Sequence, residues 1–108
     1  IKAMYDTFHA NIEEADPVGA FSRNVGNIVH FHISENDRGV PGRGNIPWDE
    51  TFAAIRSSGY DGWLTIEAFG RALKDLAAAT KVWRDLAESP EAVYREGYSH
   101  IRSGLAAA

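Results

Sequence analysis

Three side chains that can bind a divalent cation stand at the ends of three apolar, strand-like runs. They are Asp6 in IKAMYD, His32 in NIVHFHIS and Glu67 in GWLTIEAF. Two stretches typical of helices separate these runs. When parallel strands alternate with helices, the carboxyl ends of the strands meet at one rim, so we expect the three side chains to converge there on one cation. Their mixed oxygen and nitrogen donors suit Mn²⁺, Mg²⁺, Co²⁺ or Zn²⁺ without selecting one.

Each of these residues also has a purely structural interpretation. Asp6 could cap a helix or a turn, and a single buried histidine is usually a hydrogen-bonded core residue. His30 and His32 alternate along one strand, however, so both face the same side, and His32 stands at the strand end. Glu67 carries the strongest signal, because a carboxylate within LTIEAF is costly to bury unless it is paired or binds a cation.

The segment after the second strand contains further candidates for binding. Arg38 could hold a substrate hydroxyl or phosphate, or it could be an ordinary surface arginine. Gly39, Gly42 and Gly44 could approach a phosphate through their backbone amides, but they lack the strand–GxGxxG–helix and Walker patterns, so a nucleotide site is not expected. Three aromatic residues are interpreted as core or helix packing and not as a stacking platform: Trp48, Trp63 and Trp83.

Strands and helices that could position these residues alternate along the chain. Hydrophobic periodicity and Gly/Pro signals predict a strand at 1–8, a polar segment at 9–11, a short helix at 12–25, a strand at 28–34, a helix from Trp48 that ends at Gly59, a strand at 63–67, and helices at 71–88 and 90–105. The last helix has an apolar stripe of Tyr94, Tyr98, Ile101 and Leu105. Right-handed crossovers would make the three strands neighbours in one parallel sheet.

This order predicts an α/β fold of barrel type. A complete (β/α)8 TIM barrel needs eight strands and roughly 250 residues, whereas this chain has 108 residues. We therefore interpret residues 1–108 as one domain, the C-terminal portion of such a barrel, either a fragment or a half that relies on a partner. Its open sheet edges and its barrel-facing side chains Ile28, Trp63 and Thr65 predict self-association into a homo-oligomer.

Composition narrows the function classes. The chain is 44% apolar, without a run near eighteen residues, so no transmembrane helix is expected. It begins inside a strand-like run with neither a starting Met nor a basic leader, which predicts missing upstream residues and no signal peptide. The absence of cysteine excludes disulfides, thiolate metal sites and cysteine nucleophiles and suits a cytoplasmic enzyme. A net charge of -4 with mixed signs argues against a nucleic-acid surface.

Three strings, YDTFHANIEE, HFHISENDRGVPGRGNIPWDE and GYDGWLTIEAF, resemble one enzyme family in order and spacing. The family is the D-tagatose 3-epimerase and D-psicose (allulose) 3-epimerase group, within the xylose-isomerase-like barrel superfamily, and the resemblance covers residues 4–70. It implies a metal-dependent ketose 3-epimerase with Mn²⁺ as the expected cation and a small-molecule ketose as substrate. Asp6 and His32 would be metal ligands, His9 and Arg38 would contact the substrate, and Glu67 would be both a ligand and a catalytic acid/base.

The implied chemistry needs a pair of carboxylates. Epimerisation at C3 removes a proton from one face of a carbon acid and returns one to the other face, while a divalent cation stabilises the enediolate charge. The family's further ligand, a catalytic glutamate on an earlier strand, has no counterpart in this chain. Ser34 replaces a usual glycine, Asp37 a frequent asparagine and Ala68 a proline, which leaves the sugar specificity open.

Other functions on the same barrel remain open. They are a sugar isomerase, a hydroxypyruvate isomerase and an inosose-processing enzyme, and the PGRG loop favours the epimerases among them. A DNA-repair endonuclease would need more metal-binding His and Asp residues and a basic surface. The alternative outside enzymes is a non-catalytic half-barrel that self-associates.

Overall fold

Three parallel strands form one sheet in a computed structural model that describes residues 1–71 and 73–106. The strands are β1 (Ala3–Asp6), β2 (Ile28–Ile33) and β3 (Trp63–Ile66), in the spatial order β1-β2-β3. The register places Asp6 beside His32, and His32 beside Thr65. The predicted parallel sheet, with consecutive strands as neighbours, is confirmed.

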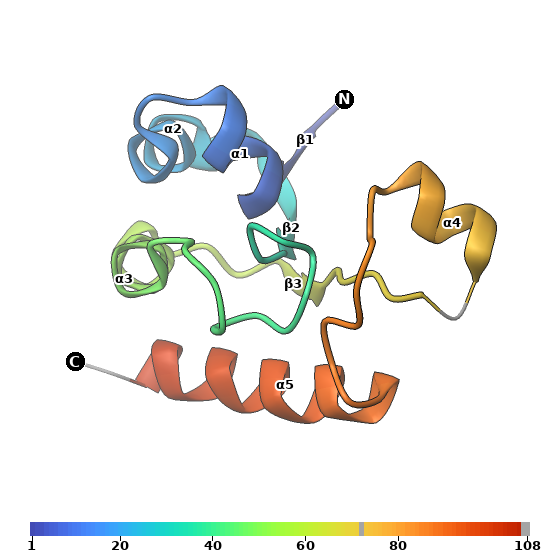
Figure 1. Ribbon diagram of the computed structural model, residues 1–108. Helices are drawn as coiled ribbons and strands as arrows, with labels where there is room; N and C mark the ends of the chain where they lie inside the picture. Colours follow the sequence, from blue (N-terminus) through green and yellow to red (C-terminus); the bar gives the residue numbers. More distant parts are fainter. Residues whose placement is uncertain (72, 107–108) are drawn as a thin grey trace.

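Helices surround this sheet unevenly. They are α1 (Thr7–Glu13), α2 (Pro17–Asn24), the 3-10 turn η1 (Val25–Asn27), α3 (Trp48–Ser58), α4 (Lys74–Ala79) and α5 (Pro90–Ala106). In Figure 1, α2, α3 and α5 follow one another along one side of the strands, whereas α4 stands apart beyond β3. Helix α3 ends as predicted, because Gly59 adopts the left-handed conformation with φ of 74°.

The hydrophobic core lies between β2 and the helices on that side. Phe31 and Ile33 are completely buried and alternate with the residues that face the other side of the sheet. The cluster also includes the first residue of β2 and residues from α2, the loop before α3, α3 and α5: Ile28, Phe21, Ile46, Trp48, Phe52, Ala54, Ile55 and Ile101. The core therefore covers one face of the sheet, and the described helices leave the other face uncovered.

The first helix begins earlier than the sequence predicts. Residues 7–13 form α1 directly after β1, so the predicted strand at 1–8 and polar segment at 9–11 are wrong at this point. The cause is Asp6, whose Oδ1 accepts a hydrogen bond from the N–H of His9 at 3.0 Å and caps the helix. Asp16 caps α2 in the same way by accepting from the N–H of Gly19. The helix predicted at 12–25 is therefore interrupted, because residues 12 and 13 belong to α1 and α2 begins only at Pro17.

The helix predicted at 71–88 is much shorter in the structure. It covers Lys74–Ala79, and residue 72 of the predicted range lies outside the described residues. Lys81 adopts a left-handed φ of 61°, and the N–H of Val82 donates to the carbonyl of Ala77 at 2.9 Å. These are the features of a Schellman-type C-cap, which ends a helix even where no glycine is present.

Several expectations about burial are also wrong. Trp48 is a core residue as interpreted, but Trp63 is 75% exposed and Trp83 is 70% exposed. Trp63 projects from the sheet face that the described helices leave uncovered. In a complete barrel we expect this face to line the interior. Ile28, by contrast, is buried in the helix-covered core and needs no further cover. Helix α5 forms as predicted, but within its stripe Tyr94 and Tyr98 are exposed while Ile101 is buried.

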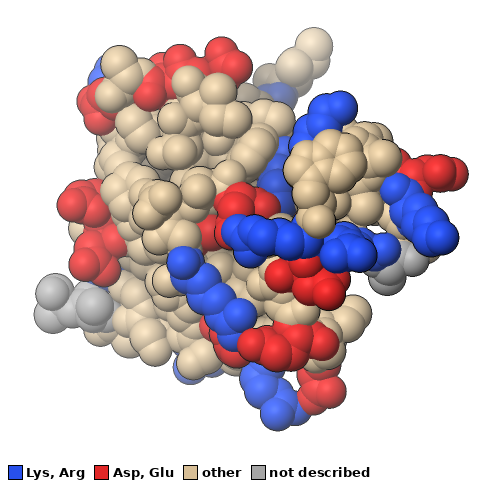
Figure 2. Space-filling model, viewed as in Figure 1, with Lys and Arg blue, Asp and Glu red and all other residues tan. Residues whose placement is uncertain are grey.

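Charged side chains of both signs are interleaved on the face drawn in Figure 2. Arg43 lies 2.6 Å from Glu96 and 3.4 Å from Glu88, and Arg84 lies 3.2 Å from Asp37. This face therefore differs from the continuous basic surface typical of nucleic-acid binding. Within residues 1–71 and 73–106, no helix combines the length and the hydropathy needed to span a bilayer.

Candidate metal centre

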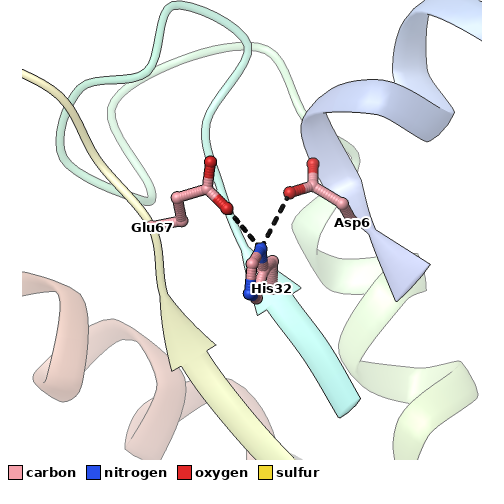
Figure 3. A group of neighbouring side chains, drawn as sticks. All are labelled: Asp6, His32 and Glu67. Atoms are coloured by element: carbon pink, nitrogen blue, oxygen red, sulfur yellow. Dashed lines mark hydrogen bonds and ion pairs between the residues drawn. The ribbon is translucent and has the colours of Figure 1, made fainter. Parts of the chain in front are cut away.

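The three residues singled out at the strand ends meet at one point. Asp6 ends β1, His32 lies beside it near the end of β2, and Glu67 follows β3, where its N–H donates to the carbonyl of Ile33 at 3.0 Å. Figure 3 shows the three side chains turned toward one another. One donor atom of each lies within 4.8 Å of the donor atoms of the others. The predicted convergence of the three side chains is present in the structure, whereas their role as ligands stays a prediction.

The imidazole of His32 stands between the two carboxylates. Its Nδ1 lies 3.2 Å from Oδ2 of Asp6 and also pairs with Oε2 of Glu67. Oδ1 of Asp6 is used by the helix cap, so this one carboxylate both starts α1 and faces the cluster. The two interpretations of Asp6 that the sequence leaves open are therefore compatible.

The donor set fits a divalent cation. It offers two carboxylate oxygens and one imidazole nitrogen, a combination that suits Mn²⁺, Mg²⁺, Co²⁺ or Zn²⁺. Asp6 is buried, while His32 and Glu67 keep about a fifth to a quarter of their side chains exposed, so the cluster is open on one side. Three protein ligands with an open side are typical of catalytic sites, where further positions are taken by water or substrate.

Arg38 joins this cluster and is not an ordinary surface arginine. Its Nη1 lies 2.6 Å from Oε1 of Glu67, and its side chain is only 12% exposed. Its Nη2 lies 3.2 Å from Nε2 of His9, and its guanidinium stacks at 3.7 Å from the ring centroid of Phe8. The structure thus brings Arg38 and His9, the two residues predicted to contact substrate, next to the proposed ligands. Whether they bind a substrate stays a prediction.

His30 lies on the same side of β2 as His32 but outside the group of donor atoms. The two imidazole rings are 5.1 Å apart and nearly perpendicular. The ligand atoms that lie within reach of one another belong to Asp6, His32 and Glu67. His30 therefore lies outside the cluster, two residues before His32 on the same face of β2. It can serve as the control position when His32 is substituted.

The glycine-rich loop is organised around a residue that the sequence analysis missed. Glu35 is completely buried, and its carboxylate accepts hydrogen bonds from the N–H groups of Asn36, Gly42 and Ile46 and from Nε1 of Trp48. The backbone amide of Gly42, one of the candidate phosphate contacts, is thus taken by an internal carboxylate at 2.8 Å. One sequence signal could have identified Glu35: it is an acidic residue between a buried strand and a glycine-rich loop whose backbone N–H groups need acceptors.

Replacing Glu35 by glutamine is expected to destabilise the protein by about 3 kcal/mol at pH 7, because hydrogen bonds to a buried charged acceptor are lost. Burial raises the pKa of Glu35, but the hydrogen bonds from Trp48, Asn36, Ile46 and Gly42 outweigh burial and leave the pKa below its ordinary value of 4.5. A lowered folded-state pKa stabilises the fold fully above about pH 4.5, and this stabilisation is lost as pH falls through the folded value.

Urea unfolding of the wild-type and Glu35→Gln chains between pH 7 and pH 3 measures this effect. The difference in unfolding free energy is expected to shrink below about pH 4.5. Glu50→Gln, a change at an exposed position in the first turn of α3, serves as the matched control and is expected to change stability by less than about 0.5 kcal/mol. A difference that is constant across the whole pH range would contradict the role of the Glu35 charge.

Comparisons with a family model and with curated proteins agree on the family that this chain resembles. The family described as xylose isomerase-like TIM barrel matches residues 1–104. Among curated proteins, a probable ketose 3-epimerase of Synechocystis sp. is 38% identical over 99 residues, which cover 92% of this chain and 34% of that protein. The chain thus spans about a third of the length of this relative.

Solved structures of similar sequence superpose closely on the chain. An L-ribulose 3-epimerase matches with a TM-score of 0.90 and 36% identity, covering 97% of this chain and 36% of that one. A D-psicose 3-epimerase from Clostridium cellulolyticum H10, crystallised with D-tagatose, matches with a TM-score of 0.82 and 38% identity, covering 96% and 38%. The three strands and their helices are therefore part of a TIM barrel, in agreement with the α/β fold class predicted from the sequence.

Proposed function

The chain belongs to the xylose isomerase-like TIM barrel family, and on that premise we propose that it is part of a metal-dependent enzyme that epimerises ketoses at C3. The observation that carries this proposal is the convergence of Asp6, His32 and Glu67 at the carboxyl ends of three parallel strands. The relatives named as ketose, L-ribulose and D-psicose 3-epimerases support the choice of reaction. We further propose that residues 1–108 are the C-terminal part of the barrel domain.

Each side chain of the cluster has a proposed role. Asp6, His32 and Glu67 hold the cation, for which Mn²⁺ is our choice. When bound, the cation supplies Lewis-acid stabilisation of negative charge on the substrate oxygens. Glu67 takes a proton from, or returns one to, C3 of the ketose, and Arg38 and His9 hold substrate hydroxyls beside it.

A second carboxylate must act on the opposite face of the sugar. Glu35, which is near the same rim, is fully buried and engaged by four N–H donors, so it is not available for this task. The partner carboxylate is therefore proposed to lie in a part of the barrel outside this chain. Because the chain lacks cysteine, we expect the enzyme in the cytoplasm, and we expect it to be a homo-oligomer.

Titration of the metal-free chain with Mn²⁺ tests the site. The wild-type chain is expected to bind one Mn²⁺ with micromolar affinity, and His32→Ala is expected to weaken binding by at least about tenfold, because a direct ligand is lost. His30→Ala is the matched control, since His30 lies on the same strand and face but outside the donor group. Isothermal titration calorimetry measures both. Equal effects of the two substitutions would contradict the assignment of the ligands, and no binding by the wild type would favour a non-catalytic half-barrel.

A further inference from the structure

Acceptors on three sides hold the guanidinium of Arg38. Its Nη1 carries two hydrogens and lies 2.6 Å from Oε1 of Glu67 and 3.2 Å from Oγ of Ser34. Its Nη2 lies 3.2 Å from Nε2 of His9. Because the guanidinium is planar and its N–H directions are fixed, acceptors in three directions determine its orientation.

Ser34 offers its hydroxyl from a rigid position. Its N–H donates to Oγ1 of Thr7 at 2.8 Å, and the Thr7 hydroxyl donates to the carbonyl of Ser34 at 2.6 Å. Ser34 is completely buried, at the point where the end of β2 meets the start of α1.

The surroundings of Arg38 leave little room for water to replace this hydroxyl. The guanidinium carbon lies 3.7 Å from the ring centroid of Phe8 and 5.1 Å from that of Phe69. The backbone of Arg38 has a left-handed φ of 67°, a conformation that costs free energy in a residue with a side chain and often occurs at functional sites. Without Oγ of Ser34, one hydrogen of Nη1 would lose its acceptor in a mostly buried environment.

We infer that Ser34 is a positioning residue that acts through Arg38 on Glu67. Arg38 engages Oε1 of Glu67, so the other oxygen, Oε2, is turned toward His32 and the proposed cation site. Ser34 determines the orientation of Arg38 and thereby selects the carboxylate oxygen that faces the cluster. This inference rests on the proposed function only in treating Glu67 as the catalytic acid/base; the contacts themselves do not depend on it.

Nitrogen-15 NMR of the arginine side chains in the metal-free chain tests the contact without an activity assay. In the wild type, Arg38 is expected to give separate Nη signals because its rotation is restrained, and its signals are assigned by their loss in Arg38→Lys. In Ser34→Ala and Ser34→Gly these signals are expected to average. Thr51→Ala is the matched control, because it removes another buried hydroxyl, bonded to the carbonyl of Pro47 at 2.7 Å, away from the cluster. Unchanged Arg38 signals in Ser34→Ala would overturn the inference.

A double-mutant cycle in the full-length enzyme tests the consequence for turnover. Ser34→Ala is expected to lower kcat for a ketose by about tenfold, with a smaller effect on KM, because the hydrogen bond to a charged group that orients Glu67 is lost. In the Arg38→Lys background the same change is expected to lower kcat by less than about twofold, since Ser34 then has no guanidinium to orient. Equal factors in both backgrounds would overturn the inference. A wild-type enzyme without epimerase activity would count against the proposed function, and the NMR result would then decide the role of Ser34.

Discussion

Replacing Glu67 by glutamine is expected to lower the turnover of the full-length enzyme by at least about 10²-fold, the low end for loss of an acid–base group. Glutamine has nearly the same size and keeps an oxygen that can accept from Nη1 of Arg38, which lies 2.6 Å from Oε1 in the wild type. It has neither the charge nor the ability to accept and return a proton. The change therefore separates the proposed proton-transfer role of Glu67 from its packing.

Conversion of D-allulose to D-fructose at saturating Mn²⁺ measures this effect, so that weaker cation binding does not lower the rate. Glu88→Gln is a suitable control, because Glu88 is an exposed carboxylate that pairs with Arg43 at 3.4 Å and lies outside the donor group. Near wild-type turnover of Glu67→Gln with the cation still bound would mean that another group moves the proton.

The candidate site could be predicted from the sequence because its signals are local. A carboxylate or imidazole at the end of an apolar run is visible in the sequence, and parallel topology then brings the strand ends together. Asp6, His32 and Glu67 satisfy this rule, and the structure brings their donor atoms within 4.8 Å of one another. The fold class follows from the same alternation of strands and helices. The matches to epimerase structures agree with it.

What the sequence could not supply depends on contacts across the chain. Glu35 looks like a surface acid in ENDRG, and its burial becomes apparent only when the loop closes on it through Gly42, Ile46 and Trp48. The helix predicted at 71–88 from hydrophobic periodicity is shorter in the structure, because the left-handed Lys81 ends it after Ala79. Exposed Tyr94 and Tyr98 belong to a regular apolar stripe, so their burial would require a neighbour outside the described elements.

The isolated chain of residues 1–108 is expected to show no epimerase activity, even with added Mn²⁺. Of the two carboxylates in its cluster, Asp6 caps α1 and Glu67 is the proposed acid/base. Under the proposed mechanism, proton return to the opposite face of the sugar therefore has no donor in this chain. Three strands also leave the sheet face with Trp63 exposed, and a substrate there would remain in contact with water. The chain spans about a third of the related ketose 3-epimerase, which agrees with a site completed by other segments.

The same open structure predicts that the isolated chain associates. A groove of about 1240 Å³ lies between β3, α4 and α5, and its lining includes the exposed apolar side chains of Leu73, Tyr94 and Tyr98. Because β3 is an edge strand whose outer side is unpaired within the described residues, another strand can add to it. Light scattering measures the association, and an assay of allulose–fructose conversion measures activity. A monomer that epimerises ketoses, and loses that activity in Glu67→Gln, would show that the three strands alone form a complete active site.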